Sequence, residues 1–136
     1  MSTNYYFEVK NNEEVINKIQ EISQFINKES IKKIEYDLKW IHIGKRSAGW
    51  KPVFQAQEYF KTIEELKQFY DNNQEKLNIK SEYDQIMTWE ELDKELIQWS
   101  PEGLSSVDEA NKNDYNYNNQ YYKDKIGYEW IDSDFS

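Results

Sequence analysis

The stretch IHIGKRSAGW, residues 41–50, holds the side chains best suited to chemistry in this 136-residue sequence. It contains the only histidine and the only arginine of the chain, together with a lysine, a serine and a tryptophan. Its two glycines let a main chain come close to a ligand. Backbone donors, two cations and an aromatic ring could therefore bind a small anion or a nucleotide here. The candidate anion-binding residues are His42, Lys45, Arg46, Ser47 and Trp50.

The same stretch also fits an ordinary turn between two strands. Glycine supplies the positive φ angles of a tight turn, and lysine and arginine are common loop residues. A phosphate-binding loop of the Walker type needs a glycine five positions before the Gly-Lys pair and a hydroxyl directly after the lysine. Lys39 and Arg46 stand at those two places. The sequence therefore favours a strand and turn over a phosphate site.

The sequence shows no residue pattern that is typical of a catalytic or metal-binding site. The 26 acidic residues show no spacing that selects an acid–base pair or a divalent-ion site. No cysteine is present, and one histidine cannot build a typical zinc site. By strand alternation His42 shares a face with Leu38 and Trp40, which is typical of a histidine at the edge of a core. We therefore expect a protein that is not an enzyme and that uses no cofactor and no metal.

Hydrophobic spacing predicts the elements that position this stretch. Alternation in NYYFEV and KIEYDLKWIHI predicts strands, and spacing of three to four after residue 12 predicts a helix. Thr62 with Glu65, and Thr88 with Glu91, match the capping box that begins a helix. The predicted strands lie near residues 4–9, 33–43, 50–55 and 127–131, and the predicted helices near 12–27, 62–76 and 88–99.

These elements predict an α+β fold, in which a small, mostly antiparallel sheet packs against about three helices in a single domain of residues 1–136. Five Trp, eleven Tyr and six Phe predict a core rich in aromatic rings. Residues 101–125 are polar and rich in Asn and Tyr, which favours a loop within the domain. An adhesive, tyrosine-bearing strip for a partner is the other interpretation.

Charge is unevenly distributed along the chain, whose net charge is −9. Residues 32–51 carry six basic and two acidic side chains, which leaves 11 basic and 24 acidic side chains elsewhere. An acidic body repels nucleic-acid phosphates and suits a basic partner surface, but it is also typical of the solvated surface of an ordinary domain. The N-terminus does not resemble a signal peptide, and no apolar run approaches the roughly 20 residues that span a bilayer. We expect a cytoplasmic protein that binds neither nucleic acid directly nor a membrane.

Three short segments, in order, give the sequence a family resemblance. STNYY at residues 2–6, HIGKRSAGW at 42–50 and EWIDSDFS at 129–136 resemble a family of small uncharacterised bacteriophage and prophage proteins, which share a TNYY start, a HIGK-S-GW element and a terminal FS. Many relatives place a cysteine pair of zinc-knuckle type between the first two elements, where this chain has no cysteine. The resemblance implies a phage setting, no particular activity and no metal-dependent role.

In that setting the leading hypothesis is an anti-defence protein that inhibits a bacterial immune complex by stoichiometric binding in the host cytoplasm. Its most concrete form is an anti-CRISPR protein whose acidic, nucleic-acid-mimicking surface occupies a basic groove of a Cas-type effector protein or ribonucleoprotein. The predicted contact residues are Asp108, Glu109, Asp114, Tyr115, Tyr117, Tyr121, Tyr122, Asp132 and Asp134.

Two other functions also fit the sequence. One is a binder or degrader of a nucleotide or cyclic oligonucleotide immune signal, which would use the anion-binding residues of HIGKRSAGW. This alternative requires Lys45 and Arg46 to act at one site. The other is a structural accessory of a phage, which would associate with another phage protein and leave host immunity unchanged.

Overall fold

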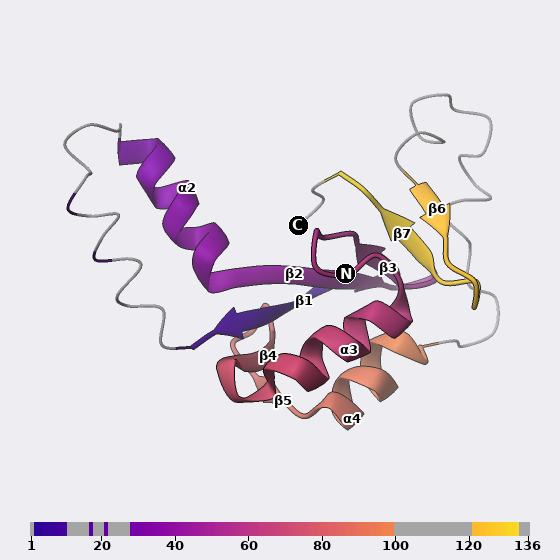
Figure 1. Cartoon of the computed structure of the whole chain (residues 1–136). Coiled ribbons are helices and arrows are strands. Elements are labelled where there is room, and N and C mark those ends of the chain that lie inside the picture. Colours follow the sequence, from indigo (N-terminus) through magenta and orange to yellow (C-terminus); the bar gives the residue numbers. More distant parts are fainter. Residues whose placement is uncertain (1, 11–16, 18–20, 22–27, 100–120, 134–136) are drawn as a thin grey trace.

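A computed structural model of the chain describes residues 2–10, 17, 21, 28–99 and 121–133 (Figure 1). The predicted helix over residues 12–27 lies outside the described residues, apart from residues 17 and 21. Residues 101–120 of the predicted loop also lie outside them.

A seven-stranded sheet forms the centre of the described structure, in the order β5-β4-β1-β2-β3-β7-β6. Neighbouring strands are antiparallel except for β3 and β7, which run parallel. The strands are β1 (Ser2–Val9), β2 (Trp40–Ser47), β3 (Val53–Gln55), β4 (Leu77–Ser81), β5 (Ile86–Met87), β6 (Tyr121–Lys123) and β7 (Glu129–Ile131). This sheet, with its helices, confirms the predicted α+β fold in a single domain.

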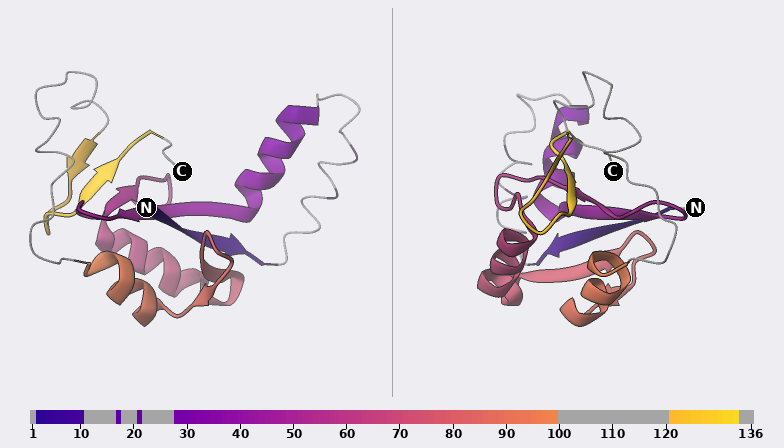
Figure 2. Two further views of the ribbon diagram at one scale, coloured as in Figure 1. Left: turned by 180° about the vertical axis from the view of Figure 1, so that it is seen from behind. Right: turned by 90° about the vertical axis from the view of Figure 1, so that its right-hand side faces the viewer.

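Helices lie on both sides of this sheet. Two of them, α3 and α4, cover one face, whereas α2 rises from the start of β2 on the other side (Figure 2). The helices are α2 (Lys28–Lys39), α3 (Ile63–Asn73) with the 3₁₀ turn η2 (Gln74–Lys76), and α4 (Trp89–Leu92) with the π-helical turn η3 (Asp93–Ile97). The face of β1 and β2 from which α2 rises is therefore not covered by α3 or α4.

The predicted strand over residues 33–43 is wrong in its first part, because residues 33–39 belong to α2. A helical pattern coincides with the alternating one there, since Ile31, Ile34 and Leu38 are spaced three and four residues apart. Lysine and glutamate, which are good helix formers, fill much of the segment. Glu29 in its first turn and Lys39 in its last turn carry charges that suit the helix dipole.

The predicted turn between two strands is present, but it does not lie at GKRS. β2 continues through GKRS to Ser47 and pairs with β3 in antiparallel register. The tight turn comes at residues 48–49, where Gly49 has a φ of 82°. The amide of Trp50 closes this turn by donating a 3.2 Å hydrogen bond to the carbonyl of Ser47. Lys45 and Arg46 are therefore consecutive strand residues, whose side chains leave opposite faces of the sheet.

A β-bulge in the β1–β2 pair decides which side chains face the core. Tyr5 pairs with Gly44 but Tyr6 pairs with His42, so Ile43 is the extra residue. Tyr5 and Ile43 are buried in the core. The rings of Tyr6 and His42 contact each other, with centroids 5.1 Å apart. Because successive strand residues point to opposite faces, Tyr6 and His42 lie on the face away from the core.

The core between the sheet and the helices α3 and α4 is rich in aromatic rings, as the composition predicts. Phe7, Phe54, Phe60 and Trp130 are fully buried. The rings of Phe7 and Phe60 meet edge-on at 6.1 Å, and those of Phe54 and Trp130 are tilted at 5.3 Å. Such pairs contribute packing energy beyond the area that they bury.

The helix starts predicted at Thr62 and Thr88 are both confirmed. Thr88 and Glu91 form a complete capping box, with hydrogen bonds of 3.1 Å from the Glu91 amide and 3.2 Å to the Glu91 carboxylate. At α3 the Thr62 hydroxyl accepts a 3.1 Å hydrogen bond from the Glu65 amide. The Glu65 carboxylate accepts its hydrogen bond from the amide of Lys61, at 2.8 Å, so this box is shifted by one residue.

Three strands without a sequence prediction complete the sheet. β4 and β5 form a hairpin beside β1, and β6 pairs with β7 at the other edge. The loop prediction over residues 101–125 does not hold for residues 121–123, which form β6. Tyrosines favour strands when they can pack, and both Tyr121 and Tyr122 are half-buried here.

Candidate functional site

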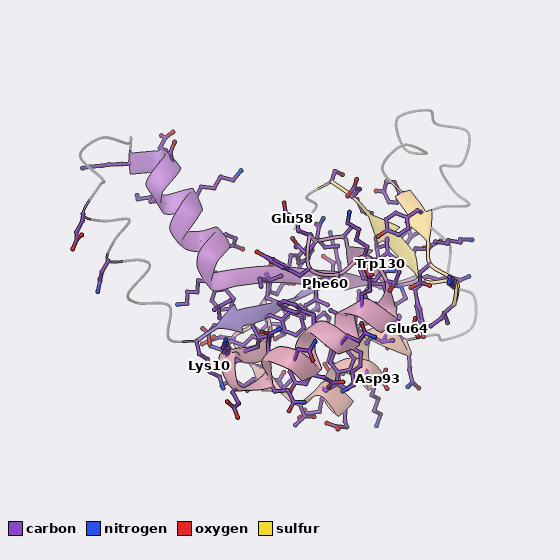
Figure 3. All side chains as sticks on the ribbon, in the orientation of Figure 1. Lys10, Glu58, Phe60, Glu64, Asp93 and Trp130 are labelled. Atoms are coloured by element: carbon purple, nitrogen blue, oxygen red, sulfur yellow. The ribbon has the colours of Figure 1, made fainter. Side chains whose placement is uncertain are left out.

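A groove of about 410 Å³ opens beside α2, on the sheet face away from α3 and α4. Figure 3 shows Glu58, which lines it, on the opposite side of the sheet from Asp93 in η3. The lining residues are Tyr6, Tyr36, Trp40, Ile41, His42, Gln55, Ala56, Gln57, Glu58, Tyr59 and Asp132. The groove therefore combines aromatic rings, side-chain amides and carboxylates.

His42 forms part of the groove floor and is buried, with 7% of its surface exposed. Its Nε2 lies 2.9 Å from Oδ1 of Asn4, and its Nδ1 lies 3.4 Å from Oε1 of Gln55. The amide nitrogen of Gln57 donates a 3.1 Å hydrogen bond to the backbone carbonyl of His42. Polar side chains from β1, β3 and the segment after β3 thus hold His42 in place.

Gln55 has a defined orientation in this network. Its amide nitrogen donates hydrogen bonds to the carbonyls of Ala56 and Ile131, both at 3.3 Å, and of Ser133 at 3.0 Å. Because the nitrogen is held by these acceptors, the amide oxygen is the atom that faces His42. Gln55 therefore links the groove floor to the C-terminal strand β7.

Aromatic rings form the walls and rim of the groove. Tyr6 packs edge-on against Trp40, with ring centroids 6.0 Å apart. On the rim, 48% of the surface of Tyr36 and 59% of that of Tyr59 are exposed. The ring of Tyr59 stacks on Phe69 of α3 at 5.3 Å, which fixes its position despite its exposure. The rim of the groove thus presents two exposed tyrosine rings to a second molecule.

Lys80 connects the Trp40 wall to a polar cluster on β1, β4 and the turn after β4. Its Nζ lies 5.7 Å from the Trp40 ring centroid, 3.2 Å from the carboxylate of Glu8 and 2.9 Å from that of Asp84. A hydrogen bond from Asn78, aided by Lys80, holds the pKa of Glu8 below its ordinary value despite partial burial. Hydrogen bonds to Asp84 and then Glu8 raise the pKa of Lys80. Two carboxylates therefore balance the charge of Lys80.

The charged side chains that line the groove itself are those of Glu58 and Asp132, and both are exposed. Among the described residues, no lysine or arginine lines it. Low-dielectric walls strengthen the field of charges at a concave surface. Both charged side chains that line the groove are therefore acidic.

The five residues predicted to bind an anion are divided between two faces of the sheet. His42 lies in the groove floor, but Arg46 is on the core side, where its Nη1 donates a 2.8 Å hydrogen bond to the backbone carbonyl of Glu95. The guanidinium also lies over the ring of Trp99, 4.3 Å from its centroid. Lys45 leaves the sheet on the face opposite to Arg46, so the two cations do not converge. The other two residues, Ser47 and Trp50, flank the turn.

The predicted partner-contact residues fall mostly outside the described structure. Those outside it are Asp108, Glu109, Asp114, Tyr115, Tyr117 and Asp134. Tyr121 and Tyr122 are half-buried in β6, where Tyr122 donates a 2.6 Å hydrogen bond to the carbonyl of Lys61 and stacks on Trp130. Burial, followed by the negative charge of Asp132, raises the pKa of Tyr122 to about 12. Asp132 is exposed and lines the groove.

Most groove residues are not singled out by sequence reasoning. A signal was present in part: Asn4 and Tyr6 alternate along β1, and Trp40 and His42 alternate along β2, so each pair shares a strand face. The sequence does not show that these two strands pair with each other. β1 and β2 are separated by 30 residues in the chain, and only their pairing brings Asn4 to His42.

Comparisons of the chain with protein-family models, with curated proteins and with solved structures found no match. In the described part of the chain, no three His, Cys, Asp or Glu side chains are grouped so that they could hold a metal ion. None of the described helices has the length and apolar character needed to cross a membrane.

Proposed function

We propose that the protein works by binding a basic partner protein stoichiometrically through the groove face, rather than by catalysis. The observation that carries this proposal is the groove itself, with the exposed rings of Tyr36 and Tyr59 on its rim and the carboxylates of Glu58 and Asp132 in its lining. Tyrosine offers a large contact area at a low cost in rotamer entropy. Carboxylates beside such rings select a partner that presents cations.

The surroundings of His42 support binding over catalysis. A general base needs a ring nitrogen within hydrogen-bond reach of a substrate proton. In His42 both ring nitrogens lie within 3.4 Å of a side-chain amide group, that of Asn4 or that of Gln55, and the ring is buried. His42 therefore acts in this proposal as a support for the groove floor.

The partner class that we propose is a basic protein or ribonucleoprotein of a bacterial defence system, in the cytoplasm of a host cell. In the anti-CRISPR form of the proposal it is a Cas-type effector, whose nucleic-acid channel is positively charged. A chain with a net charge of −9 is steered towards such a channel and competes there with nucleic acid. Asp132, one of the predicted contact residues, lines the groove and would supply one of its negative charges to this contact.

A DNA-release experiment tests the proposal. Purified Cas-type effector complexes are loaded with fluorescent target DNA, and the released DNA is measured while the protein is added. We expect release from at least one effector, with saturation at a fixed stoichiometry and with weaker inhibition at higher salt. If no effector in the panel loses DNA, the anti-CRISPR version is wrong.

A pair of matched variants tests whether the groove is the surface used. The double variant Glu58→Gln/Asp132→Asn removes two charges from the groove. The control Glu64→Gln/Glu75→Gln removes two exposed charges from α3 and η2, on the far side of the sheet. Inhibition should weaken in the first variant and match the wild type in the second. Equal effects of the two variants would contradict a role for the groove.

A further inference from the structure

We infer that the groove is a receptor for the guanidinium group of an arginine side chain. This inference rests on the proposed function and adds the chemical group that the groove recognises. A guanidinium is planar, permanently charged, and carries five N–H donors. It therefore binds best where a flat aromatic face lies beside several oxygen acceptors, and the groove offers both.

The aromatic platform is provided by the rim tyrosines. Tyr59 is held from one side by its stacking on Phe69, and 59% of its surface is exposed. Tyr36 rises beside the groove on α2 and is also exposed. Among the described residues, no lysine or arginine lies over the ring of either tyrosine. Both rings therefore offer faces on which an incoming planar cation can stack.

Trp40 shows that the wall of the groove already attracts cations. Two of the chain's own lysines lie against its ring, with Nζ of Lys39 at 5.3 Å and Nζ of Lys80 at 5.7 Å from the centroid. Lys80 is balanced by its carboxylate partners, whereas Lys39 is exposed at the end of α2. Lys39 therefore acts as a competing positive charge beside the site.

The acceptors come from three side chains. The amide nitrogen of Gln57 donates to the carbonyl of His42, so its oxygen remains to accept a hydrogen bond from a ligand. Among the described residues no donor is bound to that oxygen. The carboxylates of Glu58 and Asp132 line the same groove. Together they can accept several guanidinium donors, whereas an ammonium group has three donors and no plane to stack.

Tripeptides that differ in one side chain test this inference. The probes are acetylated and amidated Gly-X-Gly peptides in which X is arginine, lysine or citrulline, the uncharged isostere of arginine. Binding to the full chain is followed by NMR, through the side-chain signals of Trp40 and Gln57. We expect saturable binding of the arginine peptide, binding of the lysine peptide that is weaker by about threefold or more, and no saturable binding of the citrulline peptide.

Charge variants test which side chains affect the binding of the arginine peptide in the same titration. Glu58→Gln and Asp132→Asn, both at exposed positions, should each weaken the arginine peptide by about three- to fivefold. Lys39→Gln should strengthen it by about twofold, because it removes the competing cation. Glu64→Gln on α3 should leave it unchanged. Equal binding of the arginine and citrulline peptides would overturn the inference, and so would stronger binding of adenosine monophosphate than of the arginine peptide at the same signals.

The peptide titration and the DNA-release experiment test different claims, so one claim can be wrong while the other holds. If the groove variants weaken DNA release but the arginine peptide shows no preference, the guanidinium receptor is wrong and the proposed function stands. If the arginine peptide binds selectively but no effector loses its DNA, the Cas-type partner is wrong and the receptor stands.

Discussion

The indole Nε1 of Trp130 donates a 3.0 Å hydrogen bond to Oδ2 of Asp124, the residue at which β6 turns towards β7. The same oxygen accepts a 3.2 Å hydrogen bond from the amide of Ile63, the first residue of α3. The other carboxylate oxygen, Oδ1, accepts hydrogen bonds from the amides of residues 126–128. One carboxylate thus joins the C-terminal hairpin, the aromatic core and the start of α3, where a negative charge suits the helix dipole.

Removing this carboxylate should destabilise the whole domain. Asp124→Ala leaves the indole N–H of the fully buried Trp130 without its acceptor, and we expect the free energy of unfolding to fall by about 2–4 kcal/mol. Asp124→Asn should fall between this variant and the wild type, because it retains one oxygen. Urea unfolding measures the change, with exposed Glu75→Gln as the control. A loss below about 0.5 kcal/mol for Asp124→Ala would contradict the role of this side chain.

Tyr122 should titrate at unusually high pH. Its pKa is raised to about 12, chiefly by burial, so the folded state favours the neutral phenol. The stability that Tyr122 contributes is therefore complete below its ordinary value of 10 and is lost as the pH rises from 10 towards 12. In a pH titration, the tyrosinate absorbance of Tyr122→Phe is subtracted from that of the wild type. The difference should rise with a midpoint near pH 12. A midpoint near 10 would contradict the burial of this hydroxyl.

Glu8 should make stability fall in acid. The hydrogen bond from Asn78, together with Lys80, holds its pKa below the ordinary 4.5, so the folded state favours the carboxylate. The contribution is complete above pH 4.5 and is lost as the pH falls through the lower pKa of the folded state. Glu8→Gln should flatten this part of the curve of unfolding free energy against pH. Glu75→Gln is the matched control. If the unfolding free energy of Glu8→Gln fell in acid as steeply as that of the wild type, the role of Glu8 would be contradicted.

Gly44 should tolerate no side chain, for a reason different from that at Gly49. A Cβ at Gly44 would lie 2.8 Å from the carbonyl oxygen of Val53, so Gly44→Ala must push β2 and β3 apart, at a cost of about 1–3 kcal/mol. Gly49 has open space but a φ of 82°, so Gly49→Ala should cost about 1 kcal/mol through backbone strain. Only Gly44→Ala should also shift the NMR signals of His42, because it disturbs the strand that carries Gln55. Identical spectra around His42 would argue against this coupling.

Local signals in the sequence predicted the elements whose cause is local. The hydroxyl and carboxylate of Thr88 and Glu91 act within one helical turn, so their spacing predicted the start of α4. Residues 33–39 carry two overlapping periods, and the alternating one led to the wrong assignment. β6 lies in a polar tract. It is a strand because it pairs with β7 and because its Tyr122 stacks on the core residue Trp130.

The groove depends on contacts between distant parts of the chain. Asn4, His42 and Gln55 meet because β1, β2 and β3 are neighbours, which alternation within one strand does not reveal. Arg46 does not lie beside His42, as the predicted anion site requires, for a similar reason. The bulge at Ile43 and the continuation of β2 through GKRS place Arg46 against Glu95 and away from His42.

The most direct test of the central claim is to map the surface that the partner covers. Amide hydrogen exchange of the chain is compared with and without a bound Cas-type effector from the DNA-release experiment. Binding through the groove should slow exchange at residues 36–42, 55–59 and 132, and leave the exposed faces of α3 and α4 unchanged. Protection confined to α3 and α4, with no change around the groove, would contradict the proposal that this face binds the partner.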